Sequence, residues 1–390
     1  TLQQIIFSEQ VWANLRIQRH LVDAEKFTLD QQVLDVILDV TNAYFQILQA
    51  KTNVKIQQDN LDASRKNLDI AQTRNAVGYS GVADVYRLES EVANATQQLV
   101  EARNGLLQAK LQLARLLNWP DISAHFDVKD AVLTDSLFAI FDPGGIGQLV
   151  KNQRDLEIFS DFLVQEAMER QPILKQLATN KKILDRQLLL NQRAFTRPTV
   201  SLQGQANYVF LRGGAGSEVI NFIDPTTPID PINFNWNIAL NVSYPIFQGQ
   251  QRKIDLQQTR ISQYQLSLQD DLARQQLTQG VRAQVLDLMS RSTNLRFTEI
   301  SATNATRNFS IVQDSYSQGQ VSITRLIDAQ QAVFQARLGY ANAVYQYLVS
   351  FIQLEYNVGF FSIFTPEDEM EAFVERLTQY FTTQRNTPNE

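Results

Sequence analysis

The sequence predicts a mainly helical protein that also carries a few antiparallel strands, and three patterns support this fold class. Apolar residues recur every seven positions over long stretches, which is typical of helices that supercoil around one another. The segments around Gly78 and Gly319 resemble each other closely enough to be two copies of one unit. Residues 199–211 and 233–244 alternate between apolar and polar side chains, which is the period of a strand with one apolar face.

The composition limits the possible functions. The chain has 390 residues, enough for two or three domains, and its few glycines and prolines favour long uninterrupted elements. A net charge of -6 without a cluster of Lys or Arg argues against nucleic acid as a partner. Cysteine is absent, which excludes disulfides and thiolate metal sites, and His20 and His125 are the only histidines. We therefore expect no metal site, no cofactor and no enzyme.

The ends and the apolar runs are also informative. No apolar run is long enough for a spanning helix, and no leader peptide opens the chain. Thr1 falls inside a predicted element, so we expect further residues to precede it.

Two helical repeats are predicted, over residues 9–118 and 248–361. In the first, the apolar positions spaced by seven are Val33, Val40, Ile47, Val54, Leu61 and Leu68. Each repeat is expected to hold a helix of roughly 65–70 residues, a turn at Gly78 or Gly319, and a return helix of roughly 35 residues. At 1.5 Å per residue these helices are roughly 100 Å and 50 Å long.

Two further segments lie outside the repeats. Residues 119–198 begin with a mixed stretch that contains a turn at 141–145, and continue with a helical pattern that breaks at Pro172. Residues 362–390 are predicted to form a short acidic helix and a tail.

The strands are predicted in residues 1–8 and 199–247, with a long loop over 212–231. One face of the last strand carries Phe234, Trp236, Ile238, Leu240, Val242 and Tyr244, and the other is rich in asparagine. Such a strand could cover the helical core as a half-buried sheet. The helices, however, use their apolar stripes on one another, so the pattern favours the wall of an outer-membrane barrel with lipid outside and water inside. Three or four strands cannot close such a barrel, so several chains would have to contribute.

Four segments resemble the TolC-type outer-membrane efflux proteins. "NAVGYSGVADVYRLES" (75–90) and "YSQGQVSITRLIDAQ" (316–330) are similar to the paired helix-turn tips of that family. "LNVSYPIFQGQQRKID" (240–255) resembles its strand-to-helix passage, and "VTNAYFQIL" (40–48) its first long helix. The resemblance covers nearly the whole chain, and the order of the motifs matches.

The resemblance implies a homotrimer in the Gram-negative outer membrane with a long extension into the periplasm. Each protomer would give four strands to one twelve-stranded transmembrane β-barrel and its helices to a periplasmic α-barrel. The function implied is a passive exit duct of a tripartite efflux or type I secretion system. A periplasmic adaptor and an inner-membrane pump would open it. Only three strand segments are present, so the family's N-terminal helix and first strand are expected to lie outside this sequence.

The resemblance also implies site residues at the tips. The periplasmic gate and pore constriction would contain Asp84, Tyr316, Arg325 and Asp328. The tips that contact the adaptor would be Val77, Gly78, Tyr79, Gln318, Gly319 and Gln320, and the candidates for lipid-facing residues and the aromatic girdle are Tyr208, Phe210, Phe234, Trp236 and Tyr244.

This chain departs from the family at two of these positions. Val321 stands where the family often has a gate arginine, and Arg325 replaces the outer aspartate of the pore ring. Arg325 and Asp328 share one helix face because they are three residues apart. Either Arg325 takes part in gating, or it makes an ordinary surface ion pair.

The alternative from another functional class is a non-conducting periplasmic coiled-coil scaffold or tether. The internal repeat and the strands count against it. A duct dedicated to protein secretion or metal efflux would share the predicted fold. The chain has only three methionines and two histidines, too few to support a metal relay, and the sequence does not name the cargo.

Overall fold

The computed structural model describes residues 1–119, 126–129, 150–211, 213 and 232–386. The predicted loop over 212–231, the turn at 141–145, His125 and the last residues of the tail lie outside the described residues, Gly213 apart. The chain divides into two compact units. Unit 1 contains Thr1–Thr28 and Ile173–Leu272, and unit 2 contains Leu29–Pro172 and Ala273–Glu390.

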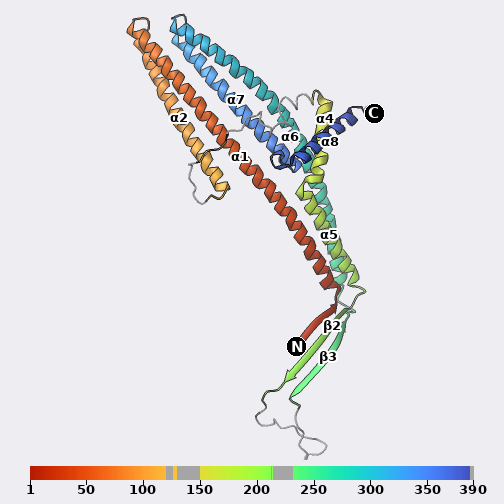
Figure 1. Cartoon of the computed structure of the whole chain (residues 1–390). Coiled ribbons are helices and arrows are strands. Elements are labelled where there is room, and N and C mark those ends of the chain that lie inside the picture. Colours follow the sequence, from red (N-terminus) through yellow and green to blue (C-terminus); the bar gives the residue numbers. More distant parts are fainter. Residues whose placement is uncertain (120–125, 130–149, 212, 214–231, 387–390) are drawn as a thin grey trace, which may run out of the picture. The chain divides into compact units, whose positions relative to one another are not determined.

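Four long helices follow the two sequence repeats (Figure 1). The first repeat contains α1 (Glu9–Ala76) and α2 (Val82–Leu116), of 68 and 35 residues. The second contains α6 (Gln251–Ser317) and α7 (Ile323–Val358), of 67 and 36 residues. These lengths agree with the sequence prediction, because the seven-residue pattern runs without interruption to each glycine turn.

The apolar seven-residue positions form the core of unit 2. Ile47 and Leu61 of α1, Leu88 of α2, and Leu288 of α6 are at most 2% exposed. The largest cluster of buried side chains combines α1, α6 and α7 with α4 (Gln153–Arg170) and α8 (Glu367–Asn386). Burial of these stripes, rather than intrinsic helix propensity, supplies most of the stability of such long helices.

Local signals set the ends of the shorter helices. Asn152 caps α4, because its side-chain oxygen accepts a hydrogen bond from the backbone N–H of Asp155 at 2.9 Å. Pro172 is the first residue of α5 (Pro172–Arg193), where its missing N–H costs nothing, so the predicted break falls between α4 and α5. A short 3-10 helix, η2 (Ser362–Phe364), precedes α8.

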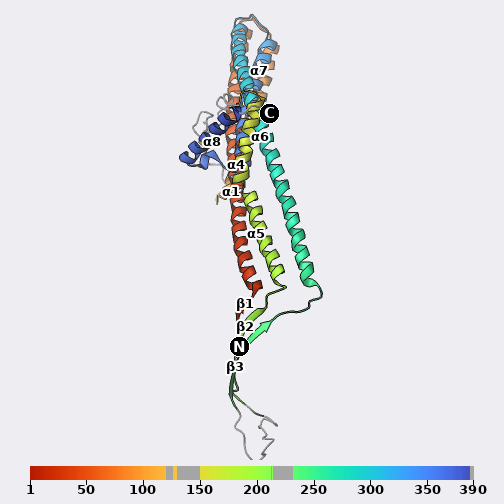
Figure 2. The ribbon, with the colours of Figure 1, turned by 90° about the vertical axis from the view of Figure 1, so that its right-hand side faces the viewer.

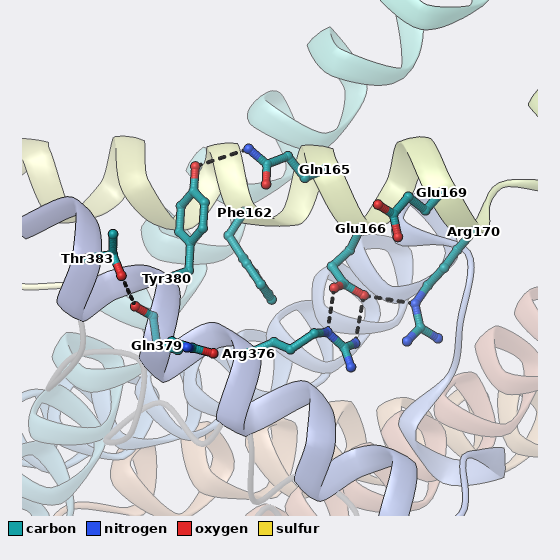
Figure 3. Close-up of a pocket in the computed structure, with 9 residues that line it drawn as sticks. All are labelled: Phe162, Gln165, Glu166, Glu169, Arg170, Arg376, Gln379, Tyr380 and Thr383. Atoms are coloured by element: carbon teal, nitrogen blue, oxygen red, sulfur yellow. Dashed lines mark hydrogen bonds and ion pairs between the residues drawn. The ribbon is translucent and has the colours of Figure 1, made fainter.

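An ion-pair cluster joins α8 to α4 (Figure 3). The buried carboxylate of Glu166 accepts two hydrogen bonds from Arg376, at 2.9 and 3.0 Å, and one from Arg170 at 3.0 Å. Burial alone would raise the pKa of Glu166, but the two guanidinium groups outweigh it and hold the pKa below its usual value. A pocket of about 710 Å³ lies beside the cluster. Both arginines already bind Glu166, so we assign no ligand to this pocket.

Glu355 is an unusual residue in the core of unit 2. Its side chain is 1% exposed near the end of α7, and Oε1 accepts the backbone N–H of Ser362 at 3.0 Å. Oε2 has no hydrogen-bond partner among the described residues. Burial raises the pKa of Glu355 to about 8, and the contact with Ser362 opposes this rise. Glu355 is therefore largely protonated at neutral pH.

Unit 1 contains a three-stranded antiparallel sheet in the order β1–β2–β3. The strands are β1 (Leu2–Phe7), β2 (Thr199–Tyr208) and β3 (Phe234–Ser243). Figure 2 shows α5 beside the first part of α1 in the same unit, where Gln176 donates to Thr28 at 2.8 Å. None of the helices in the described part of the chain is both long and apolar enough to cross a membrane.

Candidate functional site

The two helix tips have the same backbone geometry. Gly78 and Gly319 both have φ +79°, in the left-handed region that strongly favours glycine after a helix. The N–H of the next residue then bonds back to the helix. Tyr79 donates to the carbonyl of Arg74 at 2.8 Å, and Gln320 donates to that of Ser315 at 2.9 Å. The repeat recognised in the sequence is therefore one capped turn used twice, and Figure 1 shows both turns at the same end of unit 2.

The side chains around Tyr316 form the apolar centre of the tips. Tyr316 is 1% exposed and packs in a cluster with Ala71, Leu88 and Leu326. Its hydroxyl is buried and has no hydrogen-bond partner among the described residues. Burial raises the pKa of Tyr316, the charge of Arg74 opposes this rise, and the charge of Asp84 adds to it. The ring, rather than the hydroxyl, makes the contacts of Tyr316 within this chain.

Arg74 connects the first tip to the second. The centre of its guanidinium group lies 4.6 Å from the centre of the Tyr316 ring, within the range of a cation–π contact. Its Nη1 also donates a hydrogen bond to the carbonyl oxygen of Tyr316. Sequence reasoning missed Arg74. The only signal was that the equivalent position of the second repeat is Ser315, so the two copies differ there in charge.

A layer of buried polar side chains lies one to three turns from the tips. Asn67 of α1 donates to Gln330 of α7 at 2.7 Å and accepts from Gln313 of α6 at 2.7 Å. Gln330 donates in turn to Ser64 at 2.6 Å. Asn67 and Ser64 are at most 1% exposed. Buried amides are costly unless they are paired, so this layer holds three helices in one arrangement.

The predicted gate residues occupy different environments. Asp84 is partly buried in the first turn of α2, close enough to Tyr316 to influence its ionisation. Arg325 and Asp328 are both exposed on α7, and the structure describes no ion pair between them. Within one chain the structure thus brings Asp84 and Tyr316 together and leaves Arg325 and Asp328 at the surface. Their role stays a prediction.

The predicted adaptor-contacting residues lie on the exposed outside of the tips. Val77 and Tyr79 are 63% and 79% exposed, and Gln318 and Gln320 are exposed as well. One tip thus presents apolar and aromatic side chains, whereas the other presents amides.

The strand pairing separates an apolar face from a polar face. Directly paired residues point to the same face of a sheet. Tyr208 pairs with Phe234 and Ala206 with Trp236, and Leu240 lies opposite Leu202 on this apolar face. The polar face pairs Asn207 with Asn235, Gln205 with Asn237 and Ser201 with Asn241. The pattern read in the sequence is therefore present in the folded sheet.

The predicted lipid-facing residues are all exposed in this chain. The exposed fractions are 56% for Tyr208, 90% for Phe210, 51% for Phe234, 66% for Trp236 and 43% for Tyr244. The rings of Tyr208 and Phe210 meet edge to face at 4.9 Å, and the hydroxyl of Tyr244 donates to the carbonyl of Phe195 at 2.6 Å. A contiguous apolar surface of this kind indicates contact with lipid or with another chain.

Comparison with known proteins points to one family. The family model described as "Outer membrane efflux protein" matches residues 1–118 and 163–359. The outer membrane protein TolC of Escherichia coli (strain K12) is 24% identical over 361 residues, covering 92% of this chain and 68% of TolC. A crystal structure of CusC has a TM-score of 0.72 at 16% identity, covering 92% of this chain and 76% of that one. The Campylobacter jejuni CmeC outer membrane channel has a TM-score of 0.68 at 15% identity, covering 97% and 73%.

Proposed function

This chain belongs to the outer membrane efflux protein family of the Gram-negative outer membrane, and on that premise we propose that it is a passive exit duct for a tripartite efflux or type I secretion system. The observation that carries the proposal is the pair of clasped helix tips at one end of unit 2, joined by Arg74 and Tyr316. The duct itself uses no energy in this scheme. A pump in the inner membrane supplies it.

The duct is a homotrimer in this proposal. The three described strands leave the sheet open, so further copies are needed to close a barrel. On α1, the residues Leu15, Val22, Leu29 and Val36 are spaced by seven and are 43–59% exposed. On α6, Ile254, Ile261 and Leu268 form a similar stripe, 47–57% exposed. Exposed apolar stripes with this spacing support contact with neighbouring copies through coiled-coil packing.

The strands form the wall that crosses the membrane. Trp236 and the other residues of the apolar face contact lipid, and Asn235 and Asn237 line the water-filled interior. This arrangement satisfies the backbone hydrogen bonds between strands and keeps the amide side chains in water.

The helix tips form the periplasmic gate. In the closed state the Arg74–Tyr316 contact and the amide layer hold the tips together, with Asp84 beside them. Asp328 and Arg325 are exposed in a single chain, and a trimer would bring three copies of each toward one axis. Opening moves the tips apart when a periplasmic adaptor binds Val77, Gly78 and Tyr79 of one turn and Gln318, Gly319 and Gln320 of the other.

Membrane extraction and channel recording test this function together. The protein should leave the membrane only with detergent, have the mass of a trimer by native mass spectrometry, and give stepwise currents in a planar bilayer. Release by high salt without detergent, together with no current, would instead support the non-conducting periplasmic scaffold. Co-purification from cells identifies the pump and adaptor, which in turn narrow the choice of cargo.

A further inference from the structure

The passages between the strands and the helices of unit 1 carry an unusual excess of positive charge. Residues 193–197 and 244–255 contain four cationic side chains and one carboxylate, in a chain whose net charge is -6. The cations are Arg193 and Arg197 before β2, and Arg252 and Lys253 after β3. The carboxylate of Asp255 already accepts a hydrogen bond from Gln251 at 2.7 Å.

Glu9 removes only part of this charge. Its carboxylate is 8% exposed and contacts Arg186 at 2.8 Å, Arg193 at 3.1 Å and Arg197 at 3.6 Å. Three guanidinium groups thus share one carboxylate. Nε and Nη1 of Arg186 are buried and have no hydrogen-bond partner among the described residues. Uncompensated charge of this kind creates a positive potential that favours an anion nearby.

The passage after β3 combines cations with exposed apolar side chains. Ile246 and Phe247 are 89% and 84% exposed. Arg252 lies over two rings, 5.9 Å from the centre of Phe195 and 5.6 Å from that of Tyr244, and it also donates to the carbonyl of Pro245. These contacts hold the guanidinium group in place and leave part of its donors free for another acceptor.

A pocket of about 330 Å³ lies between these groups. Phe195, Ile246 and Phe247 supply its apolar lining, and Arg252 and Lys253 its positive charge. Lys253 is exposed, and the structure describes no hydrogen bond or ion pair for its ammonium group. The pocket is thus amphipathic, with charge and apolar surface side by side.

We propose that this pocket binds an anionic phospholipid of the periplasmic leaflet. The phosphate would contact Arg252 and Lys253, and the first carbons of an acyl chain would lie on Ile246 and Phe247. The inference rests on the proposed function to the extent that the strands end at the membrane surface here. Basic side chains beside a membrane attract anionic headgroups, and aromatic rings are favoured at that depth. A free phosphate would leave Ile246 and Phe247 uncovered, so the charge and the apolar surface together favour a lipid.

Lipid retention tests the proposal. The detergent-purified protein is mixed with vesicles of phosphatidylglycerol and phosphatidylcholine in equal amounts, and the lipids that remain bound are counted by native mass spectrometry. Wild type should retain phosphatidylglycerol several-fold over phosphatidylcholine. The double variant Arg252→Gln, Lys253→Gln should lose that preference, and Lys253→Gln alone, which breaks no described contact, should reduce it. Arg260→Gln, an exposed cation two turns further along α6, should behave like wild type.

Two further arms separate the possible failures. Phe247→Ser should weaken retention without changing any charge. If inorganic phosphate alone displaces the lipid fully, or if wild type shows no preference, the lipid assignment is wrong. Trimer mass and channel currents are measured on the same preparations, and the double variant should keep both. Loss of currents in wild type would count against the proposed function, whereas unchanged lipid retention in the double variant would overturn only this inference.

Discussion

Replacement of Arg74 by glutamine should favour the open state of the duct. The change removes a charge-assisted hydrogen bond to Tyr316, worth about 1.5–3 kcal/mol, and a cation–π contact, worth about 0.5–2 kcal/mol. Because Arg74 is partly exposed, solvent offsets part of this sum, and we take about 2 kcal/mol per protomer. Since 1.4 kcal/mol corresponds to a factor of ten, the ratio of open to closed tips should rise about 30-fold per protomer.

The assay is single-channel recording in a planar bilayer, with the fraction of time in the open state as the readout. Arg65→Gln is the matched control, because Arg65 lies on the same helix, is 60% exposed and makes only a 3.9 Å ion pair with Asp62. Tyr316→Phe keeps the ring and removes a hydroxyl that has no described partner, so it should remain as closed as wild type. If Arg74→Gln matches Arg65→Gln, or if Tyr316→Phe opens the duct, the assignment of the tie to Arg74 and the ring is refuted.

Three further predictions concern the wall, the core and the pore. Cysteine at Asn237 should react with a water-soluble thiol reagent in the membrane, whereas cysteine at Ile238 should not; equal labelling would contradict the assignment of the faces. Glu355→Gln should reduce the pH dependence of the thermal unfolding midpoint, compared with the exposed control Glu375→Gln. Because the pKa of Glu355 is raised to about 8, wild type is most stable below pH 4.5 and loses about 1.4 kcal/mol per pH unit up to pH 8; the same slope in the variant would exclude this residue. Asp328→Lys should raise conductance or shift ion selectivity toward anions, and unchanged currents would remove Asp328 from the constriction.

The sequence predicts the long elements well because each depends on a repeating pattern. The seven-residue spacing that includes Ile47 and Leu61 extends over each long helix, and a glycine ends that pattern at the turn. The alternation through Trp236 similarly determines which side chains share a face of the sheet. Such regularities are local in the chain, so no knowledge of distant contacts is needed to read them.

The contacts between the repeats could not be predicted in the same way. Arg74 reaches Tyr316, which is far away in the sequence, and its contact depends on which tip lies next to which. The buried ionisation of Glu355 is another example, because a single acid in an apolar stretch such as "FIQLEYNVGFF" (351–361) can face either the core or solvent. The resemblance to a family suggested a role for Tyr316 but gave no indication of the arginine beside its ring.

The amide pair of Asn67 and Gln330 limits how the long helices can slide past one another. A shift of one residue moves a side chain about 1.5 Å along the axis and about 100° around it, which would separate two groups now 2.7 Å apart. Each amide left unpaired in the interior would cost about 1–3 kcal/mol. A purely apolar seam could repack after sliding by one heptad, but a polar pair at a single level specifies one stagger. Axial translation is therefore disfavoured, and the tips beyond this level are free to pivot.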